Sequence, residues 1–326
     1  MNLLDRMTVR LGLAAMVAAG VSCPAFAAYP DKPVRLILPF APGGNPDVLA
    51  RILAQRLGQE TGQAFVVENR PGSGGNIGAE HLTRSTPDGY TLGVLDSAQT
   101  SINPSLYRNV PFDVQRDLLP IAALVAVPTV LVVNPAVPAN SVAELVQYAK
   151  SHPGEVNYGS AGNGSIHHLT TEIFASATGL RLTHVPYKGS TQTLPAVIGN
   201  QVQMAFVGVP AAKDLIQSQR VRVLAISTAR RSAALPDLPT LAESGVPDFN
   251  VAAVVGMFAP AGTPPDVVAK LRDLLSRAMT SPDVQSKLAG LGMEPTGYSP
   301  ETYAATIRSD LERYGKIVNE SGMKLD

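Results

Sequence analysis

The chain has 326 residues, a length that predicts two domains at about 150 residues each. Its 26 basic and 26 acidic residues cancel, which excludes a surface built to bind nucleic acid or an anionic membrane. Charged residues make up only 16% of the chain, and 28 Gly and 27 Pro predict a globular protein rich in tight turns. This composition excludes a disordered chain, a coiled coil and a disulfide scaffold.

The N-terminal segment has the pattern of a secretory signal peptide. Arg6 and Arg10 make a basic start, and the apolar stretch 11–21 is too short to span a bilayer. Ala25-Phe26-Ala27 then supplies a small-x-small cleavage site. We therefore expect residues 1–27 to be removed and the mature protein to be exported.

The one cysteine of the chain, Cys23, lies inside this segment. Lipid attachment to Cys23 is an alternative that Gly20 and Pro24 disfavour. Cleavage after Ala27 leaves no thiol, which removes cysteine nucleophiles, thiolate metal sites and disulfides from consideration.

Two stretches of the chain repeat one order of strands, Gly-rich loops and helices. The first has strands at 34–40, 64–68 and 90–95 and helices at 46–57 and 77–84. The second has strands at 156–159, 182–186 and 202–207 and helices at 165–178 and 191–198. Strands that alternate with helices predict two α/β units with mainly parallel sheets, and such sheets bind ligands beyond the carboxyl ends of their strands.

The remaining elements connect and extend these units. Further strands are expected at 129–133, 221–227 and 254–260. Helix starts are indicated by Asn45 before Pro46, by the capping box Ser141-Val142-Ala143-Glu144, and by the cap, proline and acid that begin near 263, 281 and 299. The chain then crosses between the two units twice, an arrangement that permits hinge closure.

Signatures of catalysis are mostly missing from the sequence. There is no G-x-S-x-G elbow and no G-x-x-x-x-G-K-[ST] phosphate loop, and His167 stands where a dinucleotide fingerprint needs a third glycine. None of the five histidines forms H-E-x-x-H, so we expect structural roles for them. We predict no catalytic residue, no metal and no cofactor.

Two glycine-rich loops instead indicate an anion-binding site. Gly43-Gly44-Asn45 and Gly162-Asn163-Gly164-Ser165 each precede a helix, where free backbone N–H groups meet the positive end of the helix dipole. Such loops hold a carboxylate without arginine, and Tyr187, Lys188 and Ser97 are further candidate donors. The alternative is that both loops are ordinary turns.

Six segments resemble the signatures of one family, the periplasmic solute-binding proteins of tripartite tricarboxylate transporters, or Bug-type receptors. The segments cover essentially the whole mature chain in order: Pro39-Phe40-x-Pro42-Gly43-Gly44-x-x-Asp47-x-x-Ala50-Arg51, Val67-Glu68-Asn69-Arg70-Pro71-Gly72-x-Gly74-Gly75-x-Ile77-Gly78, Ile102-Asn103-Pro104-Ser105-Leu106-Tyr107, Gly159-Ser160-Ala161-Gly162-x-Gly164-Ser165-x-x-His168-Leu169, Val185-Pro186-Tyr187-Lys188-Gly189 and Phe258-Ala259-Pro260-Ala261-Gly262-Thr263-Pro264.

The resemblance implies an α/β, two-domain periplasmic-binding-protein (flytrap) fold, each domain a mainly parallel sheet flanked by helices, with the ligand cleft between them. We expect domain 1 to comprise 28–124 with 250–326, and domain 2 to comprise 125–249. The residues expected to bind ligand lie on loops at the cleft: Phe40, Pro42, Gly43, Gly44, Asn45, Asp47, Asp96, Ser97, Ser160, Gly162, Asn163, Gly164, Ser165, His168, Tyr187, Lys188, Gly189 and Val207.

The sequence departs from the family pattern at three places that are expected to line the ligand cleft. Val207-Gly208 follow Phe206 in place of an Asp or Asn pair, Thr100-Ser101 replace a His-Ala pair, and Val254-Val255 replace an aromatic. Each change makes the wall of the cleft smaller or less polar.

Asp47 and Asp96 are expected to limit the negative charge that a ligand carries. An unpaired carboxylate near a bound anion is repulsive, and Lys188 is the one nearby cation that we name as compensation. For Asp47, a favourable interaction with the positive end of the helix dipole is an equal alternative to contact with a ligand. Two carboxylates against one nearby cation favour a monocarboxylate or an amino-acid-like ligand over citrate.

The resemblance predicts a monomeric periplasmic receptor that captures a small carboxylate and delivers it to a membrane permease, with no role for nucleic acid. One alternative is a sensor that presents the bound carboxylate to a sensor kinase. An exported enzyme of the same architecture is another, although it needs a set of converging reactive groups. A transcription regulator is excluded by the export signal and by the missing DNA-binding helices.

Overall fold

The computed structural model describes residues 29–209, 219–232 and 234–321, and the chain from Lys32 onward forms one compact unit. The predicted signal peptide, residues 1–27, lies outside the described residues. Within the described ranges, no helix is both long enough and apolar enough to cross a bilayer.

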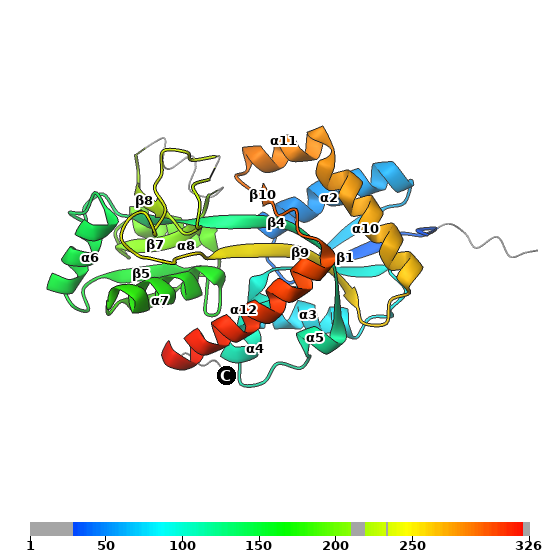
Figure 1. Cartoon of the computed structure of the whole chain (residues 1–326), viewed down its shortest axis with the longest axis horizontal. Helices are drawn as coiled ribbons and strands as arrows, with labels where there is room; N and C mark the ends of the chain where they lie inside the picture. Colours follow the sequence, from blue (N-terminus) through cyan, green and yellow to red (C-terminus); the bar gives the residue numbers. More distant parts are fainter. Residues whose placement is uncertain (1–28, 210–218, 233, 322–326) are drawn as a thin grey trace, which may run out of the picture. The chain divides into compact units, whose positions relative to one another are not determined.

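The strands of this unit follow a single hydrogen-bonded path, in the order β2-β1-β3-β9-β4-β7-β5-β6 (Figure 1). Two further strands, β8 and β10, pair with β4 off this path. The strands are β1 (Val34–Leu38), β2 (Phe65–Asn69), β3 (Thr91–Leu95), β4 (Leu118–Val133), β5 (Asn157–Ser160), β6 (Thr183–Pro186), β7 (Met204–Gly208), β8 (Arg222–Ile226), β9 (Ala252–Pro260) and β10 (Glu294–Pro295).

Each half of this path has a parallel part and an antiparallel part. As predicted, β1 pairs parallel with β2 and β3, and β5 pairs parallel with β6 and β7. The long strands β4 and β9 are antiparallel to each other, and they are also antiparallel to β7 and β3 respectively. The sheets are therefore mixed, with the parallel strands carrying the loops that were expected to bind ligand.

The long strand β4 is the largest difference from the predicted elements. Only 129–133 was expected, but the strand begins at Leu118. The part of the strand before residue 129 was not predicted, because it contains Pro120 and Pro128, and proline lacks the N–H that an interior strand donates. The pairing with β9 tolerates this by shifting register between Pro120 and Ala122 and again between Ala123 and Val125.

The segment around Ser227 joins β4, β8 and the chain that leads into β9. Ser227 Oγ lies 2.8 Å from Thr129 Oγ1 and donates to the Val251 carbonyl at 2.6 Å. The Ser227 backbone N–H donates to Thr129 O and its carbonyl accepts from Val251 N. One serine thus ties three segments together where β4 passes from the first group of strands to the second.

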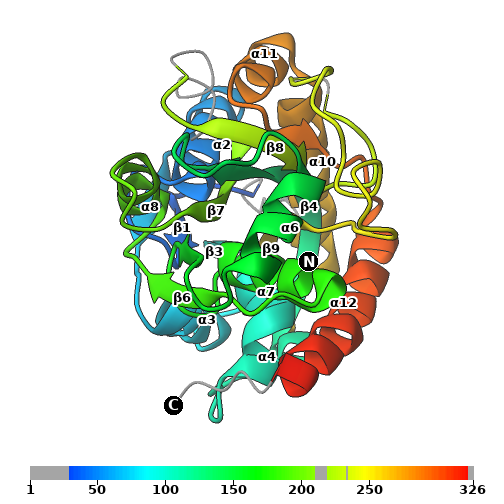
Figure 2. The same cartoon turned by 90° about the vertical axis from the view of Figure 1, so that its left-hand side faces the viewer.

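Helices cover these sheets, and most begin where they were expected. They are α2 (Asn45–Thr61), α3 (Asn76–Thr83), α4 (Asn103–Leu106), α5 (Val114–Asp117), α6 (Val142–Ser151), α7 (Ile166–Thr178), α8 (Ser190–Ile198), α10 (Pro265–Thr280), α11 (Pro282–Gly290) and α12 (Pro300–Ser321), with short helical turns η1 (Ser73–Gly75) and η2 (Ala98–Ile102). Figure 2 shows α7 and α12 in a second view, and these two helices touch.

Two helix starts test the capping predictions. At α6 Ser141 caps the helix as predicted, since its Oγ accepts from Glu144 N, but the reciprocal bond differs from a capping box, because Glu144 Oε2 accepts from Asn140 N, one residue before the cap. At α2 the helix begins at Asn45 and the capping residue is Gly44, one position earlier than predicted, without a side-chain cap. Pro46 occupies the first turn as expected.

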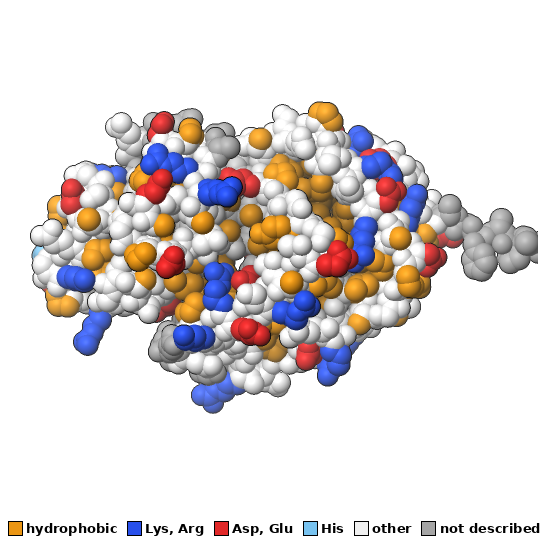
Figure 3. All heavy atoms as spheres, viewed as in Figure 1, with side chains coloured by type: hydrophobic (Ala, Val, Ile, Leu, Met, Phe, Trp, Pro, Cys, Tyr) orange, Lys and Arg blue, Asp and Glu red, His pale blue; other side chains and the backbone are white. Residues whose placement is uncertain are grey.

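One face of the molecule carries charges of both signs without segregation. Acidic and basic side chains lie interspersed over the face drawn in Figure 3. This distribution matches the balanced composition and gives that face no extended field that would attract a polyanion.

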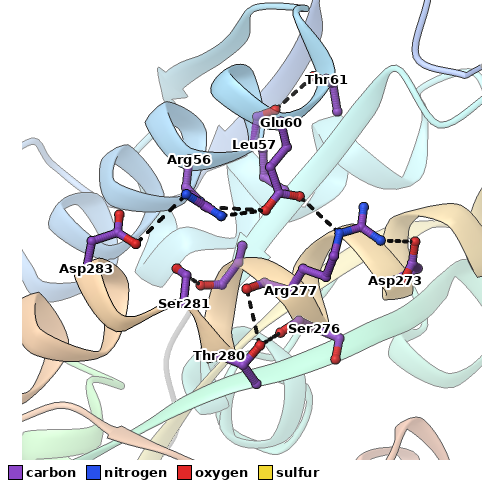
Figure 4. Close-up of polar contacts among 11 residues, drawn as sticks. Arg56, Leu57, Glu60, Thr61, Asp273, Ser276, Arg277, Thr280, Ser281 and Asp283 are labelled. Atoms are coloured by element: carbon purple, nitrogen blue, oxygen red, sulfur yellow. Dashed lines mark hydrogen bonds and ion pairs between the residues drawn. The ribbon is translucent and has the colours of Figure 1, made fainter.

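A chain of alternating charges joins α2 to α10 and α11 (Figure 4). Glu60 stands at its centre, with Oε1 3.1 Å from Arg56 Nη2 and Oε2 3.4 Å from Arg277 Nε. Arg277 also pairs with Asp273, and Arg56 Nη1 lies 3.9 Å from Asp283. The Glu60 side chain is only 14% exposed, so this carboxylate is less screened than the other members of the chain.

We expect Glu60→Gln to lower the stability of the folded protein by about 1 kcal/mol, because one change removes the charge shared by two arginines on different helices. Urea unfolding in low and high salt measures the loss, which should shrink in high salt. Asp273→Asn is the control, since it touches only Arg277 within one helix and should have a smaller effect. Equal effects of the two changes would contradict the central role of Glu60.

Candidate ligand-binding loops

The loop after β1 is held by the carboxylate of Asp47. Asp47 Oδ2 accepts from the Gly43 N–H and from Arg51 Nε, both at 3.0 Å. Its Oδ1 accepts from Arg51 Nη2 at 3.0 Å and from Asn69 Nδ2 at 2.9 Å. Asn69 Nδ2 also donates to the Phe40 carbonyl, so one buried carboxylate fixes the loop to the end of β2.

These contacts decide the ionisation of Asp47. Burial by itself would raise the pKa of this carboxyl, but hydrogen bonds from Arg51, Gly43 and Asn69 together hold the pKa below its usual value of 3.8. Asp47 is therefore ionised at neutral pH and fully occupied by protein donors. Positioning the loop is the role that these contacts support.

The loop after β5 is held by Ser160 and two histidines. Ser160 Oγ lies 2.7 Å from His184 Nε2 and accepts from the Gly162 N–H at 3.1 Å. The Gly164 N–H donates to His168 Nδ1 at 3.3 Å, and Ser165 Oγ accepts from the His168 N–H at 3.3 Å. Gly162 and Gly164 have φ values of +119° and +74°, so glycine is required at both turns.

The two histidines stack beneath this loop. The rings of His168 and His184 lie 3.9 Å apart, and Tyr158 stacks on His184 at 4.8 Å. Burial lowers the pKa of His168 to about 3, with a further contribution from His184, and burial lowers the pKa of His184 to about 4. Both rings are therefore neutral at neutral pH, and His168, which was also among the residues expected to bind ligand, is buried with its Nδ1 accepting from the Gly164 N–H.

Several N–H groups of the two loops are bonded within the protein, which limits the donors that an anion could use. Gly43, Gly162, Gly164 and Ser165 all donate their N–H groups within the protein, the last to the Gly162 carbonyl. Among the described residues, no acceptor meets the N–H groups at the first positions of the two helices: Gly44 and Asn45 at α2, and Ile166 and His167 at α7. The free donors are therefore Gly44 and the first residues of the two helices, whereas Gly43, Gly162 and Gly164 are engaged within the protein.

Other predicted site residues are engaged elsewhere or buried. Ser97 Oγ accepts from the Val254 N–H at 3.0 Å, which ties η2 to β9. Val207 lies within β7 in an apolar cluster with Val130 and Val132. Asp96 is 8% exposed and its carboxylate accepts from the Ala98 N–H at 2.8 Å.

The remaining predicted residues line the two loops with different exposures. Pro42, Asn163 and Lys188 are exposed, while Phe40 and Gly189 are half-buried. Tyr187 packs beside the second loop, because its N–H donates to the Ser160 carbonyl and its own carbonyl lies 3.2 Å from where a Cβ on Gly162 would stand.

A third group of residues meets the second loop and was missed by the sequence prediction. Gly74 O accepts from Gln99 Nε2 and from Asn103 Nδ2, both at 3.0 Å, which joins η1 to η2 and α4. A Cβ placed on Gly164 would lie 2.6 Å from Leu106 Cδ2 and 3.6 Å from Tyr107 Cε2. Three of the family-like segments thus meet at one point, and their convergence was the signal that Asn103 and Tyr107 belong near the site.

Comparison with known proteins agrees with this arrangement. The sequence profile of the family described as "Tripartite tricarboxylate transporter family receptor" matches residues 49–323. Protein BugT of Bordetella pertussis is 36% identical over 312 residues, which cover 95% of this chain and 96% of that protein. A structure of an R. palustris protein with adipate has a TM-score of 0.85 and 36% identity, covering 91% of this chain and 99% of that one. MatC from Rhodopseudomonas palustris with bound malate has a TM-score of 0.82 and 29% identity, covering 89% and 100%.

The fold and the loops at its strand ends define an α/β solute-binding protein of the two-domain type. The chain belongs to the receptor family of tripartite tricarboxylate transporters. The family resemblance predicted from the sequence is confirmed. The family and the relatives are receptors that bind solutes, which agrees with the prediction that the chain is not an enzyme.

We expect Asp47→Asn to lower stability by about 1.5–3 kcal/mol at pH 7, because it replaces a carboxylate that four N–H donors share. The low pKa of Asp47 adds stability above its unfolded value of 3.8 and loses it as pH falls through the folded value, so the difference should vanish in acid. Thermal unfolding between pH 3 and 8 measures this.

The control for Asp47 is Asp266→Asn. Asp266 also lies in the first turn of a helix, but its side chain has no hydrogen-bond partner among the described residues. A loss as large as that of Asp47→Asn would show that both act only through the helix dipole.

Asp96→Asn should have the opposite dependence on pH. Burial raises the pKa of Asp96 from 3.8 to about 6, partly offset by the Ala98 N–H, and this difference corresponds to about 3 kcal/mol. A raised pKa means that the carboxyl stabilises the fold below pH 3.8 and that this stability is lost as pH rises through about 6. The variant should therefore melt higher than the wild type at pH 8 and close to it at pH 4. A constant difference would contradict the burial of an ionised carboxylate.

Proposed function

We propose that the chain is an exported receptor that binds a small organic carboxylate at the loops that follow β1 and β5. In this proposal residues 1–27 are removed on export, the mature protein works in the periplasm as a monomer, and it delivers its ligand to a membrane permease. Membership of the receptor family and similarity to two solved structures, of a periplasmic transporter and of the periplasmic binding protein BugD, support this placement.

The observation that carries the proposal is the pair of helix starts at the ends of β1 and β5. Each presents unpaired N–H groups to an anion, and each is preceded by a loop that buried contacts hold in one shape. Donors held in place before binding lose little freedom when an anion arrives, so they bind it more tightly than flexible donors would. Two similar structures hold adipate and malate, which are small organic carboxylates.

We further propose that the two groups of strands belong to two domains, 28–124 with 250–326 and 125–249, which close on the ligand. The strands β4 and β9 are the connections that run between the groups. Small-angle scattering of the mature chain should give a smaller radius of gyration with saturating ligand than without it. An unchanged profile in the presence of a ligand shown to bind would contradict closure.

The direct test is calorimetry of the mature chain with adipate, malate, succinate, citrate and aspartate, together with the variant Gly44→Val. Gly44 has φ −78°, and a Cβ there would lie at an ordinary contact distance of 3.9 Å from Ala41 O and Pro46 Cδ, so valine adds bulk beside the free N–H groups without backbone strain. We expect the affinity of the bound acid to fall by roughly ten- to a hundredfold, the loss expected when one hydrogen bond to a charged group is removed.

Gly290→Val is the control, because Gly290 also has an ordinary φ and nothing within 4 Å of its Cβ position. Unchanged binding in a folded Gly44→Val protein would place the anion elsewhere. A mature chain that binds none of these acids would contradict a carboxylate receptor.

A further inference from the structure

Two buried asparagines beside the second loop each have an unused amide atom. Asn76 and Asn103 are 3% and 0% exposed. Asn103 Nδ2 donates to Asn76 Oδ1 at 2.7 Å and to the Gly74 carbonyl at 3.0 Å. Asn76 Nδ2 and Asn103 Oδ1 have no hydrogen-bond partner in the part of the chain that the structure describes.

The chemical identity of these two free atoms is fixed by their neighbours. The Gly74 carbonyl only accepts, so the Asn103 atom that faces it has to be the nitrogen. The Asn76 atom that faces the same nitrogen then has to be the oxygen. One donor, Asn76 Nδ2, and one acceptor, Asn103 Oδ1, therefore remain at the ends of one hydrogen-bonded amide pair.

The position of Asn103 Oδ1 connects this pair to the proposed ligand site. A Cβ placed on Gly164 would lie 3.4 Å from Asn103 Oδ1, so this oxygen faces the loop that begins α7. Gly164 has no side chain to cover it. Buried polar atoms without partners are rare in folded proteins, so two of them in one hydrogen-bonded pair call for a partner that the described part of the chain does not supply.

We propose that Asn76 and Asn103 recognise a hydroxyl group of the bound carboxylate, an inference that rests on the proposed function. The group has to accept from Asn76 Nδ2 and donate to Asn103 Oδ1. A carboxylate cannot donate and an ammonium cannot accept, but a hydroxyl oxygen does both. The amide pair is also uncharged, so it discriminates by hydrogen bonding rather than by net charge. The ligand class is a hydroxy acid.

The test compares acids that differ by one hydroxyl: lactate with propionate, malate with succinate, and citrate with tricarballylate. Calorimetry of the mature chain should show a preference for the hydroxy acid of roughly tenfold or more in whichever pair binds, because the analogue leaves both amide atoms unpaired. The ratio of the two affinities is the readout, since it cancels effects that act on both acids alike.

Two variants at position 76 locate the preference. Asn76→Asp keeps the oxygen that Asn103 Nδ2 bonds and replaces only the free donor, and Asn76→Leu removes both while Asn103 keeps its bond to Gly74. Both variants should bring the ratio of affinities close to one, although the added negative charge of Asn76→Asp lowers the affinity for both acids. Asn250→Asp is the control, because it makes the same change at an exposed residue whose side-chain oxygen keeps its bond to the Ala229 N–H. It should leave the ratio unchanged.

The outcomes separate this inference from the proposed function. Equal affinities within each pair, in a chain that binds carboxylates, would overturn the inference alone and assign the two amide atoms to a water molecule. A hydroxyl preference that survives both variants at position 76 would overturn it as well. Binding of none of these acids would overturn the proposed function first.

Discussion

The antiparallel pairing of β4 with β9 is the contact that holds the two groups of strands in one molecule. The first half of β4 pairs with β9, and its second half pairs with β7 and β8. Through β9 the pairing extends to β3, β1 and β2, and through β7 it extends to β5 and β6. Every loop that was expected to touch a ligand follows a strand placed by this central pair. The location of the site is thus a consequence of sheet order before it is a consequence of any single side chain.

Within that frame, the loops are shaped mainly by bonds that never reach a ligand. Asp47 uses all of its acceptor capacity on Gly43, Arg51 and Asn69, and Ser160 links the second loop to His184. These residues occupy family-like segments, which makes them look like ligand contacts in a sequence. Their buried positions support a different division of labour: the side chains fix the backbone, and in the function that we propose the backbone meets the anion.

Much of this fold could be predicted from the sequence, because strands and helices alternate with clear caps and periodic apolar residues. The strands β1, β2, β3, β5, β6 and β7 and the helices α2, α3, α7 and α8 lie within a few residues of their expected positions. The first part of β4 could not be predicted, because Pro120 and Pro128 are poor strand residues and only pairing with β9 shows how they are accommodated.

The candidate site was predicted less completely than the fold, for a physical reason. Local sequence marks Gly43 and Gly162 as turn residues, but it carries no information about where their N–H groups donate. The pairing of Asn76 with Asn103 spans 27 positions, and the approach of Gly164 to Leu106 spans still more of the chain. Such contacts follow from the packing of segments distant in sequence, and only a three-dimensional structure reveals them.

The junction at Ser227 has a mechanical consequence for any movement of one group of strands against the other. Its bonds to Thr129 and Val251 are the short, directional bonds of a strand ladder rather than the loose contacts of a linker. Paired strands resist being stretched or slid along each other, but they twist readily because many bonds each tilt by a small angle. In the closure that we propose, the rotation would therefore be distributed along these paired strands rather than confined to one backbone bond, and the strained ladder would favour return to the open form once the ligand leaves.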